Sequence, residues 1–186
     1  MNILMIRHPS VNCPEGTCYG QSDIPLAQNH VEEIEHLRSR LPEMTGFTIY
    51  TSPLQRCQML AEAIAPHGVI RDDDLMELDF GDWEGRKWSE LPVDEVHAWS
   101  EDFVHIAPPG GETCEAMMER CKRFWDKLIQ RGEDAIVVSH TGWIRLALAQ
   151  VLNIDPTHAF RIHIDFCGIT RVERRKGWMQ VMYINR

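Results

Sequence analysis

A short apolar run near the start of the chain constrains the fold more than any other stretch. Residues 3–6 (Ile-Leu-Met-Ile) are all apolar, and Arg7 and His8 follow at once. A run this short, apolar at every position, is typical of a strand buried on both faces of a parallel sheet. Ligands of an open α/β sheet bind beyond the carboxyl ends of its strands. Arg7 and His8 are expected at such an end, although the pair alone is better explained as a polar strand exit.

Length and composition narrow the class of protein. The 186 residues, 44% of them hydrophobic, suggest a single globular domain over 1–186. The net charge of −9 argues against a nucleic acid or an anionic membrane as partner. No apolar run could cross a bilayer, and the first one is too short for a signal peptide, which favours the cytoplasm. None of the six cysteines forms a Cys-x-x-Cys pair, which makes zinc and dithiol redox sites weak hypotheses.

Hydrophobic periodicity predicts alternating strands and helices. Strands are expected at 47–50, 69–70 and 135–138, with a closing hairpin at 169–174 and 178–184. Helices are expected at 29–41, 93–104 and 142–152. Two more have cap signals: one runs from Ser52 as N-cap and Pro53 to Ile64, and one from Thr113 as N-cap to Arg131, with Gly132 past its end. Residues 75–85 are expected to form a structured loop. We predict a three-layer α/β/α fold, with a mostly parallel open sheet and helices on both faces.

Polar side chains follow three of the predicted strands. Arg7 and His8 follow the strand at 3–6, and His140 follows the strand at 135–138. Arg56 lies in the helical turn after the strand at 47–50. Arginine presents paired N–H donors to phosphate oxygens, and a neutral histidine can attack phosphorus to form a phosphoramidate. A second histidine can hydrogen-bond the transferring group, and a nearby carboxylic acid can protonate the leaving oxygen. Together these residues predict a phosphoryl site.

The same residues belong to an ordered set of motifs that resembles the histidine phosphatase superfamily, the phosphoglycerate-mutase-like enzymes. The motifs are Arg7-His8, Thr-Ser-Pro-Leu-Gln-Arg-Cys at 51–57, the segment 75–85, Pro-Gly-Gly-Glu-Thr at 109–113 and Val-Ser-His-Thr-Gly at 138–142. The resemblance spans most of the chain. It implies a phosphoglycerate-mutase-like fold, a small phosphorylated substrate, and no metal or other cofactor.

The resemblance also implies roles for single residues. His8 is the nucleophile, Arg7, Arg56 and His140 hold the phosphoryl group, and Glu77 is the acid–base residue. The residues by themselves agree on all of these except Glu77. Three other carboxylates lie so close that spacing cannot choose among them: Asp79, Asp82 and Glu84. Glu84 and Glu112 also have structural explanations, as a loop brace and a helix-start residue.

Within the superfamily, residues 16–26 and 78–84 are similar to segments of α-ribazole phosphatases. Those enzymes dephosphorylate α-ribazole 5′-phosphate during assembly of the nucleotide loop of cobalamin. The likeness implies the same activity here, with Tyr19 and Gly20 contacting the substrate. The short chain also fits a phosphatase better than a mutase.

Other hypotheses remain open from the sequence. One is a broad small-molecule or phosphosugar phosphatase. Another is a non-catalytic phospholigand-binding module, suggested by Pro9, which stands where the family usually has Gly and has no N–H to offer a phosphate. A third is a metallohydrolase using His8, His140 and carboxylates around Asp79, which no local metal-ligand motif supports. The oligomeric state is open, with a homodimer as one alternative.

Overall fold

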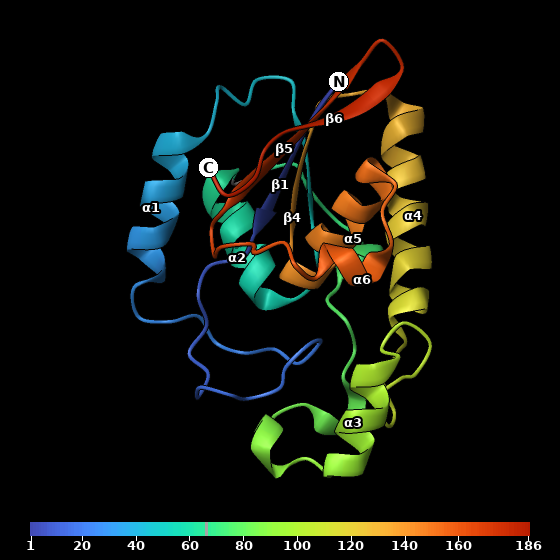
Figure 1. Ribbon diagram of the computed structural model, residues 1–186. Helices are drawn as coiled ribbons and strands as arrows, with labels where there is room; N and C mark the ends of the chain where they lie inside the picture. Colours follow the sequence, from blue (N-terminus) through green and yellow to red (C-terminus); the bar gives the residue numbers. More distant parts are fainter. Residues whose placement is uncertain (66) are drawn as a thin grey trace.

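A six-stranded mixed sheet forms the centre of the computed structural model, which describes residues 1–65 and 67–186 (Figure 1). The strands are β1 (Asn2–Arg7), β2 (Thr48–Thr51), β3 (Val69–Arg71), β4 (Ala135–Ser139), β5 (Ile169–Arg175) and β6 (Trp178–Tyr183). Their order is β3-β2-β4-β1-β5-β6. The first four are parallel, while β5 and β6 add an antiparallel hairpin at one edge. The open, mostly parallel sheet was predicted correctly.

Helices cover both faces of the sheet, as the three-layer prediction requires (Figure 1). They are α1 (His30–Arg40), α2 (Gln55–Ile64), α3 (Val93–Glu101), α4 (Cys114–Arg131), α5 (Thr141–Leu152) and α6 (Pro156–Ala159). Successive side chains of a strand point to opposite faces. Ile3 and Met5 accordingly pack in the core with α4 and α5, while Leu4 and Ile6 pack with α1 and α2. The apolar run that opens the chain therefore serves two cores.

In the part of the chain that the structure describes, no helix is long and apolar enough to cross a membrane.

The helix α4 begins and ends as its sequence predicts. The Thr113 hydroxyl accepts a hydrogen bond from the Ala116 N–H at 3.0 Å, which satisfies one of the free N–H groups of the first turn. Gly132 follows the helix with φ of +67°, a left-handed conformation that glycine adopts without a steric penalty. Cap residues at both ends thus fix the length of the longest helix.

Three helices show the clearest differences from the sequence prediction. The helix expected from Ser52 begins only at Gln55, because Ser52 remains tied to the sheet. Its N–H donates to the Val138 carbonyl at 3.0 Å, and its hydroxyl lies 2.8 Å from His140 Nε2. The α3 helix ends at Glu101 rather than at residue 104, and α6 was not predicted. Long-range contacts therefore override the local capping signal at Ser52.

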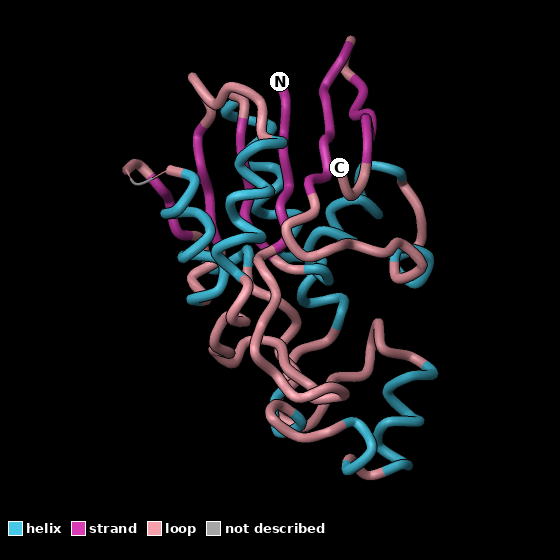
Figure 2. The backbone as a smooth tube through the Cα atoms, turned by 90° about the vertical axis from the view of Figure 1, so that its left-hand side faces the viewer, coloured by secondary structure: helices cyan, strands magenta, loops and turns pink. Residues whose placement is uncertain are grey.

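The path of the chain makes a crevice between β1 and β4. The two strands are adjacent and parallel, with Arg7 level with Ser139. The chain leaves β1 towards α1 on one face, and leaves β4 into α5 on the other. Such a divergence is where open α/β sheets bind ligands. Loops gather below this end of the sheet (Figure 2). The next residues of the two strands, His8 and His140, lie side by side, with their ring centroids 5.1 Å apart.

The N-cap of α4 predicts a stability change. Replacing Thr113 by Ala should lower the free energy of unfolding by about 1 kcal/mol, because the Ala116 N–H loses its acceptor. Thr113→Ser keeps the hydroxyl and should stay close to the wild type. Urea unfolding of the three proteins measures the difference, and equal losses in both variants would show that the cap does not stabilise the helix.

Candidate functional site

Two histidines form the centre of the site. The ring centroids of His8 and His140 lie 5.1 Å apart, and the two residues are 2% and 0% exposed. The His8 N–H donates to the Ser139 carbonyl at 3.1 Å, which continues the pairing of β1 with β4 by one residue. The sheet thus sets the position of both rings.

The tautomer of His8 follows from its hydrogen bond. Its Nδ1 lies 2.7 Å from the Pro9 carbonyl oxygen. A carbonyl oxygen can only accept, so Nδ1 carries the proton and the neutral ring has its lone pair on Nε2. On the second ring, His140 Nε2 lies 2.8 Å from the Ser52 hydroxyl.

Burial keeps both rings neutral. It is the largest cause that lowers the pKa of His8 well below the ordinary value, and the charges of Arg56 and Arg7 lower it further. The pKa of His140 falls well below the ordinary value for the same first reason, with Arg56 and His8 adding to it. His8 is therefore an uncharged base at neutral pH, the state in which its nitrogen can act as a nucleophile.

Both predicted phosphate-binding arginines reach this centre. The guanidinium of Arg56, 1% exposed, donates to the carbonyls of Gly20 at 2.5 Å and Ser22 at 2.8 Å. Arg7 donates to the Ile164 carbonyl at 2.6 Å. Within residues 1–65 and 67–186, neither arginine has a carboxylate within ion-pair distance. Backbone carbonyls fix the position of both guanidiniums without neutralising their positive charge, which stays available to an anion.

Arg7 has a second support. Its guanidinium carbon lies 3.6 Å from the centroid of the Phe166 ring, a cation–π geometry. The same ring lies 5.6 Å from the His8 ring. Burial lowers the pKa of Arg7, while the nearby Tyr19 and Glu77 act in the opposite direction. Phe166 was not singled out from the sequence, because nothing local to it indicates that it reaches the end of β1.

Glu77 is fixed by backbone N–H groups. Its Oε1 accepts from the Leu78 N–H at 3.0 Å and its Oε2 from the Gly142 N–H at 3.0 Å. A Cβ atom at position 142 would stand 2.2 Å from Oε1, so any larger residue there would displace the Glu77 carboxylate from this position. Of the four carboxylates between residues 77 and 84, Glu77 alone lines the cavity beside His8.

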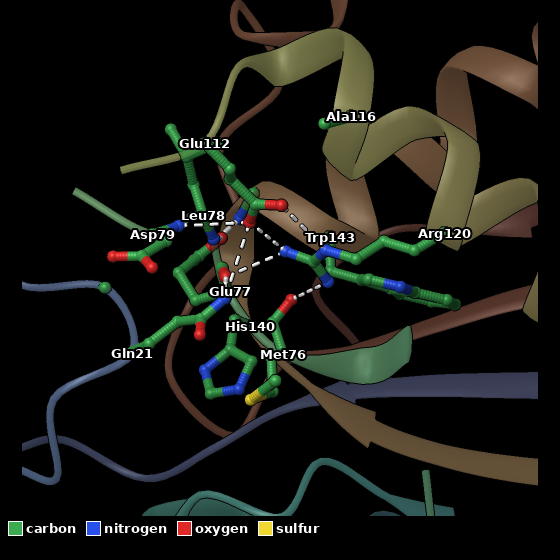
Figure 3. Close-up of polar contacts among 12 residues, drawn as sticks. Gln21, Met76, Glu77, Leu78, Asp79, Glu112, Ala116, Arg120, His140 and Trp143 are labelled. Carbon is green, nitrogen blue, oxygen red and sulfur yellow. Dashed lines mark hydrogen bonds and ion pairs between the residues drawn. The ribbon is translucent and has the colours of Figure 1, made fainter. Parts of the chain in front are cut away.

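A buried ion pair holds the Glu77 backbone (Figure 3). Arg120 Nη2 lies 2.5 Å from a carboxylate oxygen of Glu112 and donates to the Glu77 carbonyl at 2.8 Å. The Gln21 side chain donates to the same carbonyl at 3.0 Å. Glu112 also accepts from the Asp79 N–H at 3.1 Å, so it does more than start a helix. The pair therefore ties α4 to the segment that carries Glu77.

Two other carboxylates of this segment, Asp79 and Glu84, have structural roles. Asp79 accepts from the Gly81 N–H at 2.8 Å. Glu84 accepts from the N–H groups of Gln21 at 2.8 Å and Ser22 at 2.6 Å, which makes it the loop brace that the sequence suggested. The described residues contain no group of three or more histidine, cysteine, aspartate or glutamate side chains placed to hold a metal ion.

A cavity of about 250 Å³ opens beside His8. Arg7, Glu77 and Tyr19 line it, as does Arg145, which sequence reasoning missed. Much of the wall is apolar, formed by Leu78, Phe80, Trp88, Met117 and Phe160.

Three predicted site residues stay outside that lining. Arg56 and His140 are buried next to it, and Gly20 contributes the carbonyl that Arg56 binds. The carbonyls of Gly20 and Ser22 each take one N–H from a terminal nitrogen of Arg56, whereas its buried Nε has no hydrogen-bond partner among the described residues, so donors remain for a phosphoryl group. The loop that carries Tyr19 and Gly20 therefore helps to position Arg56, although Gly20 itself does not line the cavity.

Comparison with known proteins places these features in a family. The chain matches the sequence model of the histidine phosphatase superfamily (branch 1) over residues 3–186. It is 27% identical over 176 residues to the adenosylcobalamin/alpha-ribazole phosphatase of Escherichia coli (strain K12), covering 89% of this chain and 86% of that protein. It is 30% identical over 181 residues to a bifunctional protein of Mycobacterium tuberculosis, covering 92% of this chain and 50% of that protein. The chain thus spans half the length of that mycobacterial relative.

The fold is shared with a solved structure. The alpha-ribazole phosphatase from Shigella flexneri superposes with a TM-score of 0.92 at 24% identity, covering 100% of this chain and 96% of that one.

The buried histidines predict how stability depends on pH. Both pKa values are lower in the folded state, so between the unfolded value of 6.5 and the lower folded values the unfolded chain binds protons that the folded protein excludes. Stability therefore falls as the pH drops below that value, by up to about 1.4 kcal/mol per pH unit for each ring. In urea unfolding between pH 7 and 5, His8→Asn should lose stability less steeply than the wild type. Parallel curves would contradict the neutral, buried state of His8.

Proposed function

The chain belongs to the histidine phosphatase superfamily, and on this premise we propose that it is a metal-independent phosphomonoesterase that forms a phosphohistidine on His8. The observation that carries the proposal is the state of that ring. It is neutral, its Nδ1 is bound to the Pro9 carbonyl, and its Nε2 lone pair is unprotonated. Two guanidiniums without carboxylate partners lie next to it, which is the environment that a phosphoryl dianion needs.

The proposed reaction has two steps. In the first, His8 Nε2 attacks phosphorus, the bond to the alcohol oxygen breaks, and Glu77 gives that oxygen its proton. Arg7, Arg56 and His140 hold the phosphoryl oxygens. In the second, water attacks the phosphohistidine while Glu77 takes a proton from it, and the P–N bond breaks to release inorganic phosphate and neutral His8. The position of Glu77 beside His8 in the cavity supports this double role.

We further propose α-ribazole 5′-phosphate as the substrate. The similarity to the adenosylcobalamin/alpha-ribazole phosphatase of Escherichia coli supports it, and so does the likeness of residues 16–26 to α-ribazole phosphatases. The apolar wall of the cavity suits a planar benzimidazole ring. A kcat/KM for simple sugar phosphates far above that for α-ribazole 5′-phosphate would favour the broad phosphatase instead.

A trapping experiment tests the nucleophile. Rapid quench with ³²P-labelled substrate should give an adduct that is labile to acid and stable to base, as a phosphoramidate is, and peptide mapping should place it on His8. Turnover should persist after exhaustive chelation, because Arg7 and Arg56 supply the positive charge that a metal ion gives in other phosphatases. An acid-stable adduct, label retained in His8→Ala, or activity restored only by zinc or magnesium would reject the mechanism.

A leaving-group comparison tests the acid. The ribose 5′-oxygen of α-ribazole 5′-phosphate is a poor leaving group that needs a proton, whereas nitrophenolate barely needs one. Glu77→Gln should lower kcat for α-ribazole 5′-phosphate by roughly 10² to 10⁴, and for p-nitrophenyl phosphate distinctly less. Asp79→Asn is the matched control. Equal losses with both esters in Glu77→Gln, together with a selective loss in Asp79→Asn, would transfer the role to Asp79.

A further inference from the structure

Arg145 is a cation of the cavity that the proposed reaction does not use. It lies on α5, five residues after His140, and lines the cavity with His8 and Glu77. Its Nε donates to the Ile162 carbonyl at 2.7 Å, and its guanidinium carbon lies 5.5 Å from the centroid of the Phe160 ring. These contacts hold the guanidinium from one side.

The terminal nitrogens of Arg145 are unoccupied. Across residues 1–65 and 67–186 they have neither a hydrogen-bond acceptor nor a carboxylate within ion-pair distance. Glu77, the carboxylate that acts on Arg145, already accepts two backbone N–H groups. Burial lowers the pKa of Arg145, in keeping with a half-buried guanidinium whose one hydrogen-bond partner among the described residues is at Nε. A bound molecule with an acceptor would satisfy these donors.

The phosphoryl group is not the obvious acceptor. Arg145 is near enough to Arg7 for its charge to lower the pKa of Arg7, but its guanidinium is held at the side of the cavity formed by Phe160 and Ile162. Phe160, which contacts Arg145, belongs to the apolar wall together with Phe80, Trp88 and Met117. Arg145 therefore faces the space that the alcohol part of a phosphomonoester would fill.

We propose that Arg145 is a specificity-determining residue that binds a hydrogen-bond acceptor on the leaving alcohol. The site would then select phosphomonoesters whose alcohol combines a planar apolar ring with an oxygen or nitrogen acceptor, as a nucleoside-like alcohol does. The inference rests on the proposed phosphatase activity and adds a residue that recognises the alcohol part of the substrate. The ring packs on the apolar wall, and the acceptor takes the free N–H groups of Arg145.

Substrate pairs separate this role from a general one. Arg145→Gln should lower kcat/KM for α-ribazole 5′-phosphate by about 10- to 100-fold, mostly through KM, since one hydrogen bond to a charged donor is lost. Phenyl phosphate has a ring without an acceptor and should lose far less. Arg145→Lys keeps the charge without the planar fork and should fall between. Arg161→Gln, a change of an exposed arginine near by, is the matched control and should behave as the wild type with both esters.

Two outcomes would overturn the inference and leave the phosphatase standing. One is an equal loss with phenyl phosphate, which would mean that Arg145 acts on the phosphoryl group or on the fold. The other is a selective loss with phosphoserine, whose alcohol has a carboxylate and no ring, while α-ribazole 5′-phosphate is unaffected.

A binding measurement keeps the test independent of turnover. In the His8→Ala background, calorimetry should show Arg145→Gln weakening α-ribazole 5′-phosphate by a similar factor while inorganic phosphate binds as before. Equal affinities for α-ribazole 5′-phosphate with and without the change would overturn the inference. Absence of any turnover in the wild type, with this binding difference intact, would instead reject the proposed function alone.

Discussion

The burial of two imidazoles side by side is the constraint on which the rest of the site depends. At 5.1 Å between centroids and almost fully buried, His8 and His140 cannot both carry charge, and burial keeps both neutral. That arrangement needs a strand wrapped by helices on both faces, which the alternation of Ile3 and Met5 with Leu4 and Ile6 provides. The core thus determines the protonation state of the site.

The buried Arg56 guanidinium makes the neighbouring loop part of the same system. A charged group with no ion partner is expensive to bury unless its N–H donors are satisfied, and the carbonyls of Gly20 and Ser22 satisfy part of the Arg56 guanidinium while its buried Nε has no partner among the described residues. Glu84 holds the loop in that position. Burial alone would raise the pKa of Glu84, but hydrogen bonds from Ser22, Gln21 and Phe80 lower it overall. A phosphoryl group that accepts from the remaining N–H donors of Arg56 would therefore supply both a missing acceptor and the missing negative charge.

Sequence reasoning found what depends on local pattern and missed what depends on distant partners. The strand before His8 and both caps of α4 follow from periodicity and cap chemistry, and they agree with the structure. Ser52 is an equally good N-cap residue by type, yet its hydroxyl is hydrogen-bonded to His140, which lies 88 residues further along the chain. The local sequence pattern cannot indicate so distant a partner. Glu77 stands out from its neighbours only through the N–H of Gly142, 65 residues away, so spacing could not select it. Nothing in the local sequence distinguishes Arg145 from other residues of its helix, because its role depends on Phe160 and the cavity, which only the fold places beside it.

Pro9 illustrates how a departure from a family pattern can preserve the feature that matters. Proline removes an N–H that could have bound phosphate, and this was the sequence's one hint of a non-catalytic module. What the structure uses at this position is the carbonyl, which accepts from His8 Nδ1 at 2.7 Å and leaves the Nε2 lone pair unprotonated. The pyrrolidine ring fixes φ, and the next residue is anchored as well, since Ser10 donates from its N–H and its hydroxyl to Glu33 at 2.8 and 2.7 Å. Because the Pro9 carbonyl is fixed in position, it keeps His8 in one tautomer. Pro9 is therefore compatible with a nucleophilic role for His8.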